Sequence, residues 1–228
     1  GNIATDESPF NNDGSIYGAS WINGVSNSGL EFDGVNDYVE VEDSPSLDMA
    51  GSNQFTMEAW INLTQKKSGW YDHILNKEYS YEFAILPNLH IGWAISTTER
   101  SWYWVDTGSS IKIGEWTHIA ITYDGSQVKT YKNGNLVHTL SYSGELRDWS
   151  SKLTIGWRQS RCSNCPFNGV IDEVRIINRS LTEEEIREDF ESTAPFGYCS
   201  HTCESDCGAD SSCDNLNPGF SCGLNTIC

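Results

Sequence analysis

Hydrophobic and polar residues alternate along much of this chain, which is the spacing of extended strands with one buried face. In residues 55–61 every second side chain is apolar, and the other side of the segment is mostly polar. Residues 116–123 repeat this alternation. Similar short runs recur up to residue 177, so the pattern predicts about eleven short strands.

The strands are separated by turn residues. Asn133-Gly134 stands between the alternating runs 128–132 and 136–140. An Asn-Gly pair in this position predicts a hairpin, because both turn residues adopt positive φ. We therefore predict an all-β chain: an antiparallel, two-sheet sandwich of the jelly-roll kind.

One segment departs from the two-residue period. Thr182 and Glu185 have the spacing of a capping box, and Leu181 with Ile186 forms the apolar staple around it. Ile186 and Phe190 lie four residues apart and so share one helical face. The sequence predicts one short helix here.

The composition changes near residue 195. Ser, Asn, Gly, Asp and Cys prevail beyond it. A segment this poor in aliphatic residues cannot build a hydrophobic core, so cross-links are expected to hold it. We predict a β-sandwich over residues 1–194 and a disulfide-bonded, cysteine-rich tail over residues 195–228.

The chain has eight cysteines, and none precedes Cys162. Their even number and crowding predict disulfides formed in an oxidising compartment. Zinc is the alternative for Cys162-x-x-Cys165, but the later spacings fit no zinc ribbon. The sequence leaves the pairing open. The disulfide candidates are Cys162, Cys165, Cys199, Cys203, Cys207, Cys213, Cys222 and Cys228.

The net charge limits the classes of partner that this chain is expected to bind. Thirty-two acidic residues face 14 Lys and Arg, a formal net charge of −18. Such a surface repels phosphate backbones, which disfavours nucleic acid. No run of about 18 apolar residues occurs, so membrane insertion is not expected. Together with the cysteines, the sequons at Asn62 and Asn178 favour a secreted or cell-surface glycoprotein.

Six segments in series carry a family pattern. They lie at residues 30–41, 55–61, 114–125, 131–137, 167–176 and 181–186. They include Glu-Phe-Asp-Gly, Glu-Trp-Thr-His and Tyr-Lys-Asn-Gly. In this order they resemble the laminin-G-like jelly rolls of the concanavalin A-like lectin/glucanase superfamily. The resemblance covers about residues 6–192, and the cysteine-rich tail lies outside it.

Catalytic machinery is missing from the sequence. Hydrolases of that superfamily carry a Glu-x-Asp-x-(x)-Glu strand, which aims an acid and a nucleophile into one cleft. No strand here has that pattern, and the acidic residues at 183–189 are explained by helix capping. By the resemblance, His118 occupies a structural position. We therefore expect no catalytic residue and no enzyme.

Asp172 is the candidate for metal binding. Period two places it on the side of Val170 and Val174. If that side is inward, a carboxylate at the edge of the core needs a strong partner, and Ca²⁺ is sufficient. Without an ion, Asp172 would accept backbone amides or pair with Arg175 or Arg158.

The resemblance implies a structural calcium where the strand of Asp172 meets the N-terminal segment. The companion ligands that it implies are Asp6, Asn12, Asp33 and the carbonyl of Gly34.

Aromatic clusters suggest sugar binding, because flat rings stack on the C–H faces of sugars. Residues 102–105 place aromatic side chains on both faces of one strand, so one face is exposed or covered by a loop. Core packing is the alternative for each ring. The candidates are Trp70, Tyr71, Trp93, Trp102, Tyr103 and Trp104.

These features predict an extracellular recognition or adhesion module that binds glycans or cell-surface proteins. The alternative is a structural subunit of a cell-surface layer or extracellular fibre, whose partner is a second copy of itself. A polysaccharide hydrolase or lyase is disfavoured by the missing carboxylate strand.

Overall fold

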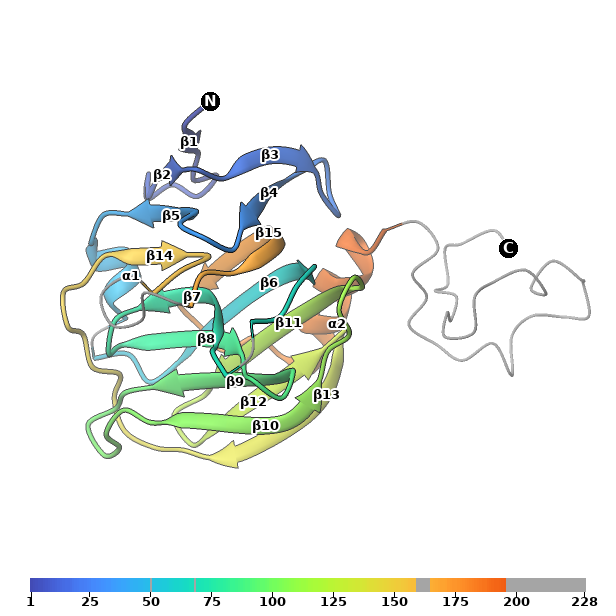
Figure 1. Cartoon of the computed structure of the whole chain (residues 1–228). Coiled ribbons are helices and arrows are strands. Elements are labelled where there is room, and N and C mark those ends of the chain that lie inside the picture. Colours follow the sequence, from blue (N-terminus) through green and yellow to red (C-terminus); the bar gives the residue numbers. More distant parts are fainter. Residues whose placement is uncertain (50, 68, 159–164, 196–228) are drawn as a thin grey trace, which may run out of the picture.

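The computed structural model describes residues 1–49, 51–67, 69–158 and 165–195. Within them, two antiparallel sheets face each other (Figure 1). The eight-stranded sheet has the order β1 (Ile3–Ala4), β2 (Gly14–Tyr17), β5 (Tyr38–Val41), β14 (Leu153–Ile155), β7 (Asp72–Lys77), β8 (Tyr81–Ile85), β9 (His90–Ile95) and β10 (Trp104–Ser110). The seven-stranded sheet has the order β13 (Asn135–Ser141), β12 (Gln127–Lys132), β11 (Trp116–Tyr123), β6 (Phe55–Leu63), β15 (Asn168–Ile177), β4 (Ser28–Asp33) and β3 (Ser20–Asn23). The predicted all-β, two-sheet sandwich is confirmed.

Alternate residues of both sheets fill the space between them. On β6, Phe55, Met57 and Ile61 are fully buried in this core, as their period of two predicts. Trp60 points the other way, toward helix α2 (Glu183–Thr193). Each strand therefore has one face in the core and one face available for other contacts.

The predicted hairpin joins β12 to β13. Asn133 and Gly134 form its two-residue turn, with φ of 51° and 72°. Both values are positive, which Asn and Gly tolerate best, so the sequence determines this turn locally.

Helix α2 begins at the predicted capping box. The Thr182 side chain accepts a hydrogen bond from the Glu185 amide, and the Glu185 carboxylate accepts one from the Thr182 amide. The Phe190 ring stacks on Trp60, with centroids 5.4 Å apart. The helix thus covers the outer face of the seven-stranded sheet. A one-turn helix, α1 (Pro45–Asp48), connects β5 to β6.

The short N-terminal strands β1, β2 and β3, of two to four residues each, were not among the predicted runs. Apart from residue 195, the predicted cysteine-rich tail, residues 195–228, lies outside the described residues, so its predicted disulfide-bonded structure stays a prediction. No helix in the described part of the chain is long and apolar enough to span a bilayer.

Candidate functional site

The outer face of the eight-stranded sheet is organised by strand register. Asn76 of β7 pairs with Glu82 of β8, Glu82 with Ala94 of β9, and Ala94 with Trp104 of β10. Phe83, the next residue on β8, points into the core. Because side chains alternate between faces, Asn76, Glu82 and Trp104 face away from the core.

A pocket of about 340 Å³ lies at the β10 end of this face. It is lined by Tyr71, Leu86, Pro87, Asn88, Trp104 and Asp106. The rings of Tyr71 and Trp104 meet edge to face, with centroids 4.9 Å apart and planes at 82°. Two aromatic rings beside polar groups form the kind of surface that holds a sugar ring.

Asp106 supplies the polar edge of this pocket. Its carboxylate accepts a 2.8 Å hydrogen bond from the side-chain amide of Asn88 and another of 2.8 Å from the backbone amide of Gly108. Its Oδ1 also lies 2.8 Å from Nδ1 of His90. Partial burial raises the pKa of Asp106, but these bonds outweigh burial and lower it below the ordinary value. The pocket therefore presents a negative charge at neutral pH.

Two enclosed titratable residues lie beneath the aromatic pair. Nε2 of His73 is 3.5 Å from Oε2 of Glu82, which also accepts a 2.6 Å hydrogen bond from the Asn76 amide. Burial, together with the positive charge of Arg158, lowers the pKa of His73 to about 3. Burial raises the pKa of Glu82 to about 8. Both groups are therefore uncharged near pH 7.

Arg158 closes this cluster. Its Nη1 lies 3.3 Å from Oε1 of Glu82, and its Nε donates a 3.0 Å hydrogen bond to Glu78. The His73 ring also packs against Trp104, with centroids 5.6 Å apart. Because His73 and Glu82 are almost fully enclosed, they support the floor under Trp104 and do not reach a ligand.

The structure brings together Tyr71 and Trp104 from the predicted sugar-binding set. Trp70 and Tyr103 lie at the surface, 46% and 41% exposed, and do not line the pocket. Trp102 is half-buried and packs edge to face against Tyr79, with centroids 5.8 Å apart.

Trp93 was wrong as a sugar-binding candidate. It is 0% exposed and belongs to the core between the sheets. Its ring packs against Tyr142, with centroids 5.5 Å apart. Alternation on β9 decides this, because Ala94 takes the outward position that Trp93 would need.

Sequence reasoning missed Asn88, in the turn between β8 and β9, and Asp106, on β10, which meet only through strand pairing. It also missed a second aromatic group on the same sheet. The rings of Tyr17 and Tyr38 stack 4.5 Å apart on paired residues of β2 and β5, and Trp157 packs against Tyr38. The alternation of Tyr38 with Val39 could have indicated an outward ring.

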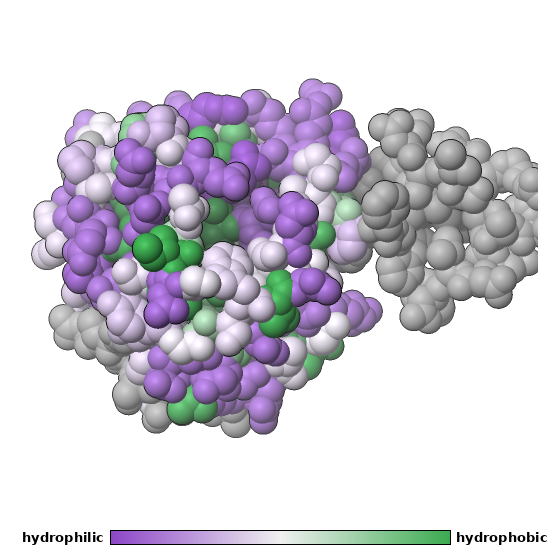
Figure 2. All heavy atoms as spheres, turned by 90° about the horizontal axis from the view of Figure 1, so that it is seen from above, coloured by the Kyte–Doolittle hydropathy of each residue, from purple (hydrophilic) through white to green (hydrophobic). Residues whose placement is uncertain are grey.

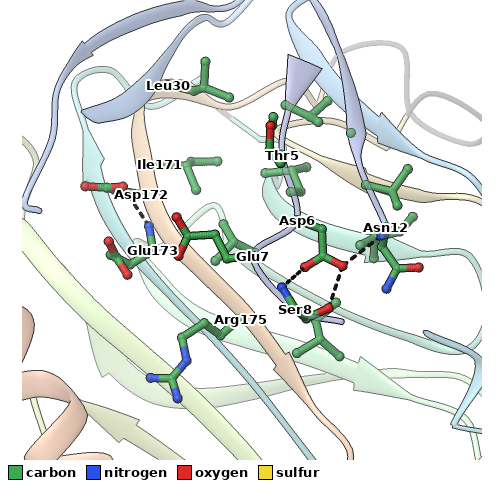
Figure 3. A pocket seen from close by; sticks show the side chains of 18 of the residues that line it. Thr5, Asp6, Glu7, Ser8, Asn12, Leu30, Ile171, Asp172, Glu173 and Arg175 are labelled. Atoms are coloured by element: carbon green, nitrogen blue, oxygen red, sulfur yellow. Dashed lines mark hydrogen bonds between the residues drawn. The ribbon is translucent and has the colours of Figure 1, made fainter. Parts of the chain in front are cut away.

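Three of the metal candidates, Asp6, Asn12 and Asp172, line a different cavity, a hollow of about 600 Å³ between the sheets at the N-terminal end. Asp6 and Asn12 lie on one wall and Asp172 on another (Figure 3). Asp6 accepts hydrogen bonds from the Asn12 amide at 2.8 Å and from Ser8, so its carboxylate already closes a turn.

Asp172 does not face inward, which was the condition for the calcium argument. Asp172 pairs with Trp60, whose side chain faces outward, and Glu173 interrupts β15 with a φ of 48°. The register shift at this irregularity places Val174 against the core and leaves Asp172 on the opposite face. Asp172 is therefore buried outside the core.

Backbone amides satisfy Asp172. Its Oδ2 accepts hydrogen bonds from Val25 at 2.8 Å and Ser26 at 3.2 Å, and its Oδ1 accepts one from Glu173 at 2.8 Å. Arg175 does not contact Asp172. Its Nη1 lies 2.9 Å from Oε1 of Glu58 on β6 and 2.9 Å from Oδ1 of Asp189 on α2. Of the alternatives that the sequence left open, amide binding is the one observed.

The five predicted calcium ligands do not converge. Asp33 pairs with Asn168, four residues before Asp172 along β15, which is about 13 Å at the rise of a strand. The Asp33 carboxylate accepts a 2.7 Å hydrogen bond from the Val35 backbone amide, and the Gly34 carbonyl accepts one from the Lys67 ammonium. These donors do not fit one calcium site.

One acidic group in the described residues has carboxylates close enough to share an ion: Asp43, Asp48 and Asp148. The ammonium of Lys77 lies among them, 2.5 Å from Asp43, 3.1 Å from Asp48 and 4.0 Å from Asp148. Lys77 occupies the position between these carboxylates and offsets part of their negative charge, so the group is a structural ion cluster.

Cys165 is buried and disulfide-bonded. Cys162 and the cysteines from Cys199 onward lie outside the described residues. Among the sequons, Asn178 is exposed, whereas Asn62 is half-buried on β6 with its amide oxygen enclosed.

Comparison with known proteins places this geometry in context. The model of one protein family, described as the concanavalin A-like lectin/glucanases superfamily, matches residues 33–187. No curated protein sequence matches the chain.

Several solved structures share the fold. One is the binding domain of Paraclostridial Mosquitocidal Protein 1, with a TM-score of 0.69 and 18% identity over 82% of this chain and 49% of that one. Another is the botulinum neurotoxin serotype D binding domain, with a TM-score of 0.65 and 16% identity over 85% and 52%. The chain thus spans about half the length of these toxin domains.

A third similar structure is domain 4 of AbnA, an extracellular arabinanase from Geobacillus stearothermophilus, solved with arabinotriose. It has a TM-score of 0.61 and 21% identity over 78% of this chain and 88% of that domain. At these identities the likeness shows a common fold.

Proposed function

Because the chain belongs to the concanavalin A-like lectin/glucanase superfamily, we propose that it is a non-catalytic module that binds neutral glycans in the pocket between Tyr71 and Trp104. The observation that carries this proposal is the pairing of two aromatic rings with the carboxylate of Asp106 in one small pocket. Rings bind the apolar face of a sugar, and the carboxylate accepts hydrogen bonds from its hydroxyls.

The charge of the pocket supports a neutral ligand. Asp106 keeps a lowered pKa, and the chain has a net charge of −18. Uronic and sialic acids would meet repulsion at this edge. The similar arabinanase domain, solved with arabinotriose, supports the same class of ligand.

The lining also supports a non-catalytic role. Glycosidases of the common types need two carboxyl groups facing the scissile bond. Asp106 is the one acidic side chain among the described residues that line the pocket. Glu82, whose raised pKa would suit a general acid, is enclosed beneath the pocket.

An extracellular location is part of the proposal. The disulfide at Cys165 supports it, because disulfides persist in oxidising compartments. Glycans and cell-surface partners are then within reach.

Titration of the full chain with arabino- and cello-oligosaccharides, backed by a glycan array, tests the binding proposal. Trp104→Ala should weaken binding by about tenfold or more, as expected for loss of a stacking ring. Trp21→Ala, which removes a 44% exposed ring from the other sheet, should leave binding unchanged. Absence of glycan binding, or equal loss in both variants, would contradict the proposal, and cleavage of any bound glycan would overturn its non-catalytic part.

A further inference from the structure

The hollow between the sheets has apolar walls. They are formed by Leu30, Phe32, Val39, Val41, Ile155, Ile171 and Val174. Its volume of about 600 Å³ falls within the range of small-molecule sites, about 300–1,000 Å³. Ile155 and Val174 stay partly exposed although they pack against the core, so apolar surface remains for a ligand. Figure 2 looks onto this end of the molecule and shows hydrophobic atoms between hydrophilic ones.

The mouth of the hollow is acidic. Asp6, Glu7 and Glu173 lie around it (Figure 3). Burial raises the pKa of Glu173, and the nearby charges of Asp172 and Glu7 raise it further. The carboxylates of Glu7 and Glu173 are therefore close enough to repel each other.

The nearest cation, Arg175, relieves this repulsion only in part, because its charge lowers the pKa of Glu173 while burial, Asp172 and Glu7 raise it. Arg175 lines the hollow, but its Nη1 is 2.9 Å from Glu58 and 2.9 Å from Asp189. Those partners lie on β6 and α2, outside the sandwich interior. The mouth therefore keeps excess negative charge above an apolar cavity.

We propose that this hollow binds an aliphatic amine, with its hydrocarbon chain between the sheets and its ammonium beside Glu7 and Glu173. Burying the chain removes apolar surface from water at about 25 cal/mol per Å². The ammonium meets the carboxylates at the mouth, whereas a carboxylate head group would be repelled there. Charge complementarity thus selects the cationic amphiphile.

The site is independent of the glycan pocket, because β4, β5, β14 and β15 form its walls and none of them lines the Tyr71–Trp104 pocket. Loss of glycan binding would leave this proposal standing, and the reverse also holds.

Isothermal titration of the full chain with decylammonium and with decanoate, each below its micelle concentration, tests the proposal. Decylammonium should bind with 1:1 stoichiometry. Decanoate should bind at least about tenfold more weakly, since it places a like charge at the mouth. Equal binding of the two probes, or decylammonium binding at many equivalent sites, would overturn the proposal.

Two variants locate the binding. Val174→Phe fills the hollow and should abolish tight binding. The double variant Glu7→Gln with Glu173→Gln should bind decylammonium about fivefold more weakly. Glu188→Gln, on the exposed side of α2, is the matched control for general attraction of cations to an acidic chain and should change nothing. If Val174→Phe does not fold, the double Gln variant still tests the proposal. An unchanged affinity of that variant for decylammonium would contradict it.

Discussion

Nε2 of His73 and Oε2 of Glu82 lie 3.5 Å apart, enclosed on the outer side of β7 and β8. Burial opposes the charge of each group, so the pKa of His73 falls to about 3 and that of Glu82 rises to about 8. The pair is neutral near pH 7. At lower pH His73 takes up a proton, and at higher pH Glu82 releases one. The pH dependence of folding stability therefore involves both residues.

Glu82 should make the protein less stable as the pH rises. Its folded pKa of about 8 exceeds its ordinary 4.5, so the folded state holds a proton that the unfolded state releases. Its contribution is fully present below pH 4.5 and is lost as the pH rises through about 8, at up to about 1.4 kcal/mol per pH unit. Glu82→Gln should flatten this slope in urea unfolding measured from pH 5 to 9. A slope unchanged by the substitution would contradict an enclosed, protonated Glu82.

His73 should have the opposite effect on the acid side. Its folded pKa of about 3 lies below the ordinary 6.5, so the unfolded state takes up the proton first. The contribution of neutral His73 is present above pH 6.5 and is lost as the pH falls toward 3. His73→Gln should reduce the loss of stability between pH 6.5 and 4. A loss of stability that the substitution leaves unchanged would contradict an enclosed, neutral His73.

Most of the fold follows from local patterns. The alternation in residues 55–61, the Asn133-Gly134 turn and the Thr182–Glu185 capping box each fix an element through its own residues. The side-chain direction on β15 could not be predicted this way. One residue with positive φ, Glu173, reverses the alternation after it, and no residue type there signals a left-handed conformation.

The candidate site was less accessible to sequence reasoning. Tyr71 and Trp104 stand out as aromatic residues, but their contact requires β7, β8, β9 and β10 to pair in one register. His73 and Glu82 are nine residues apart and come together through the β7–β8 hairpin, which has an irregularity near His73. Such tertiary pairings leave no local period in the sequence.

Asp172 should stabilise the fold without a metal ion. Three backbone amides, from Val25, Ser26 and Glu173, bind its carboxylate, and the other predicted ligands lie elsewhere. We expect the melting temperature to be unchanged in EDTA. Asp172→Ala should lower the free energy of unfolding by about 1–3 kcal/mol, because it leaves buried amides unpaired. A melting temperature that falls by several degrees in EDTA would instead restore the calcium predicted from the sequence.

Lys77 is a further enclosed charge, 0% exposed at the end of β7. Its ammonium bridges Asp43 and Asp48 and donates a 2.7 Å hydrogen bond to the Ser151 carbonyl. It therefore ties α1 and the loop before β14 to the eight-stranded sheet. Lys152, in contrast, pairs with Glu40 and Glu42 at the surface.

Lys77→Met should destabilise the protein strongly, because it leaves Asp43, Asp48 and Asp148 to repel one another without a counter-charge. Breaking a buried ion pair in this way costs about 3–5 kcal/mol. Lys152→Met removes a surface ion pair and should cost less than about 1 kcal/mol. Urea unfolding of both variants at pH 7 measures the difference. Added calcium should restore part of the stability of Lys77→Met, since the vacated carboxylates then suit a divalent cation. Equal losses in the two variants would show that the Lys77 cluster contributes no more than a surface pair.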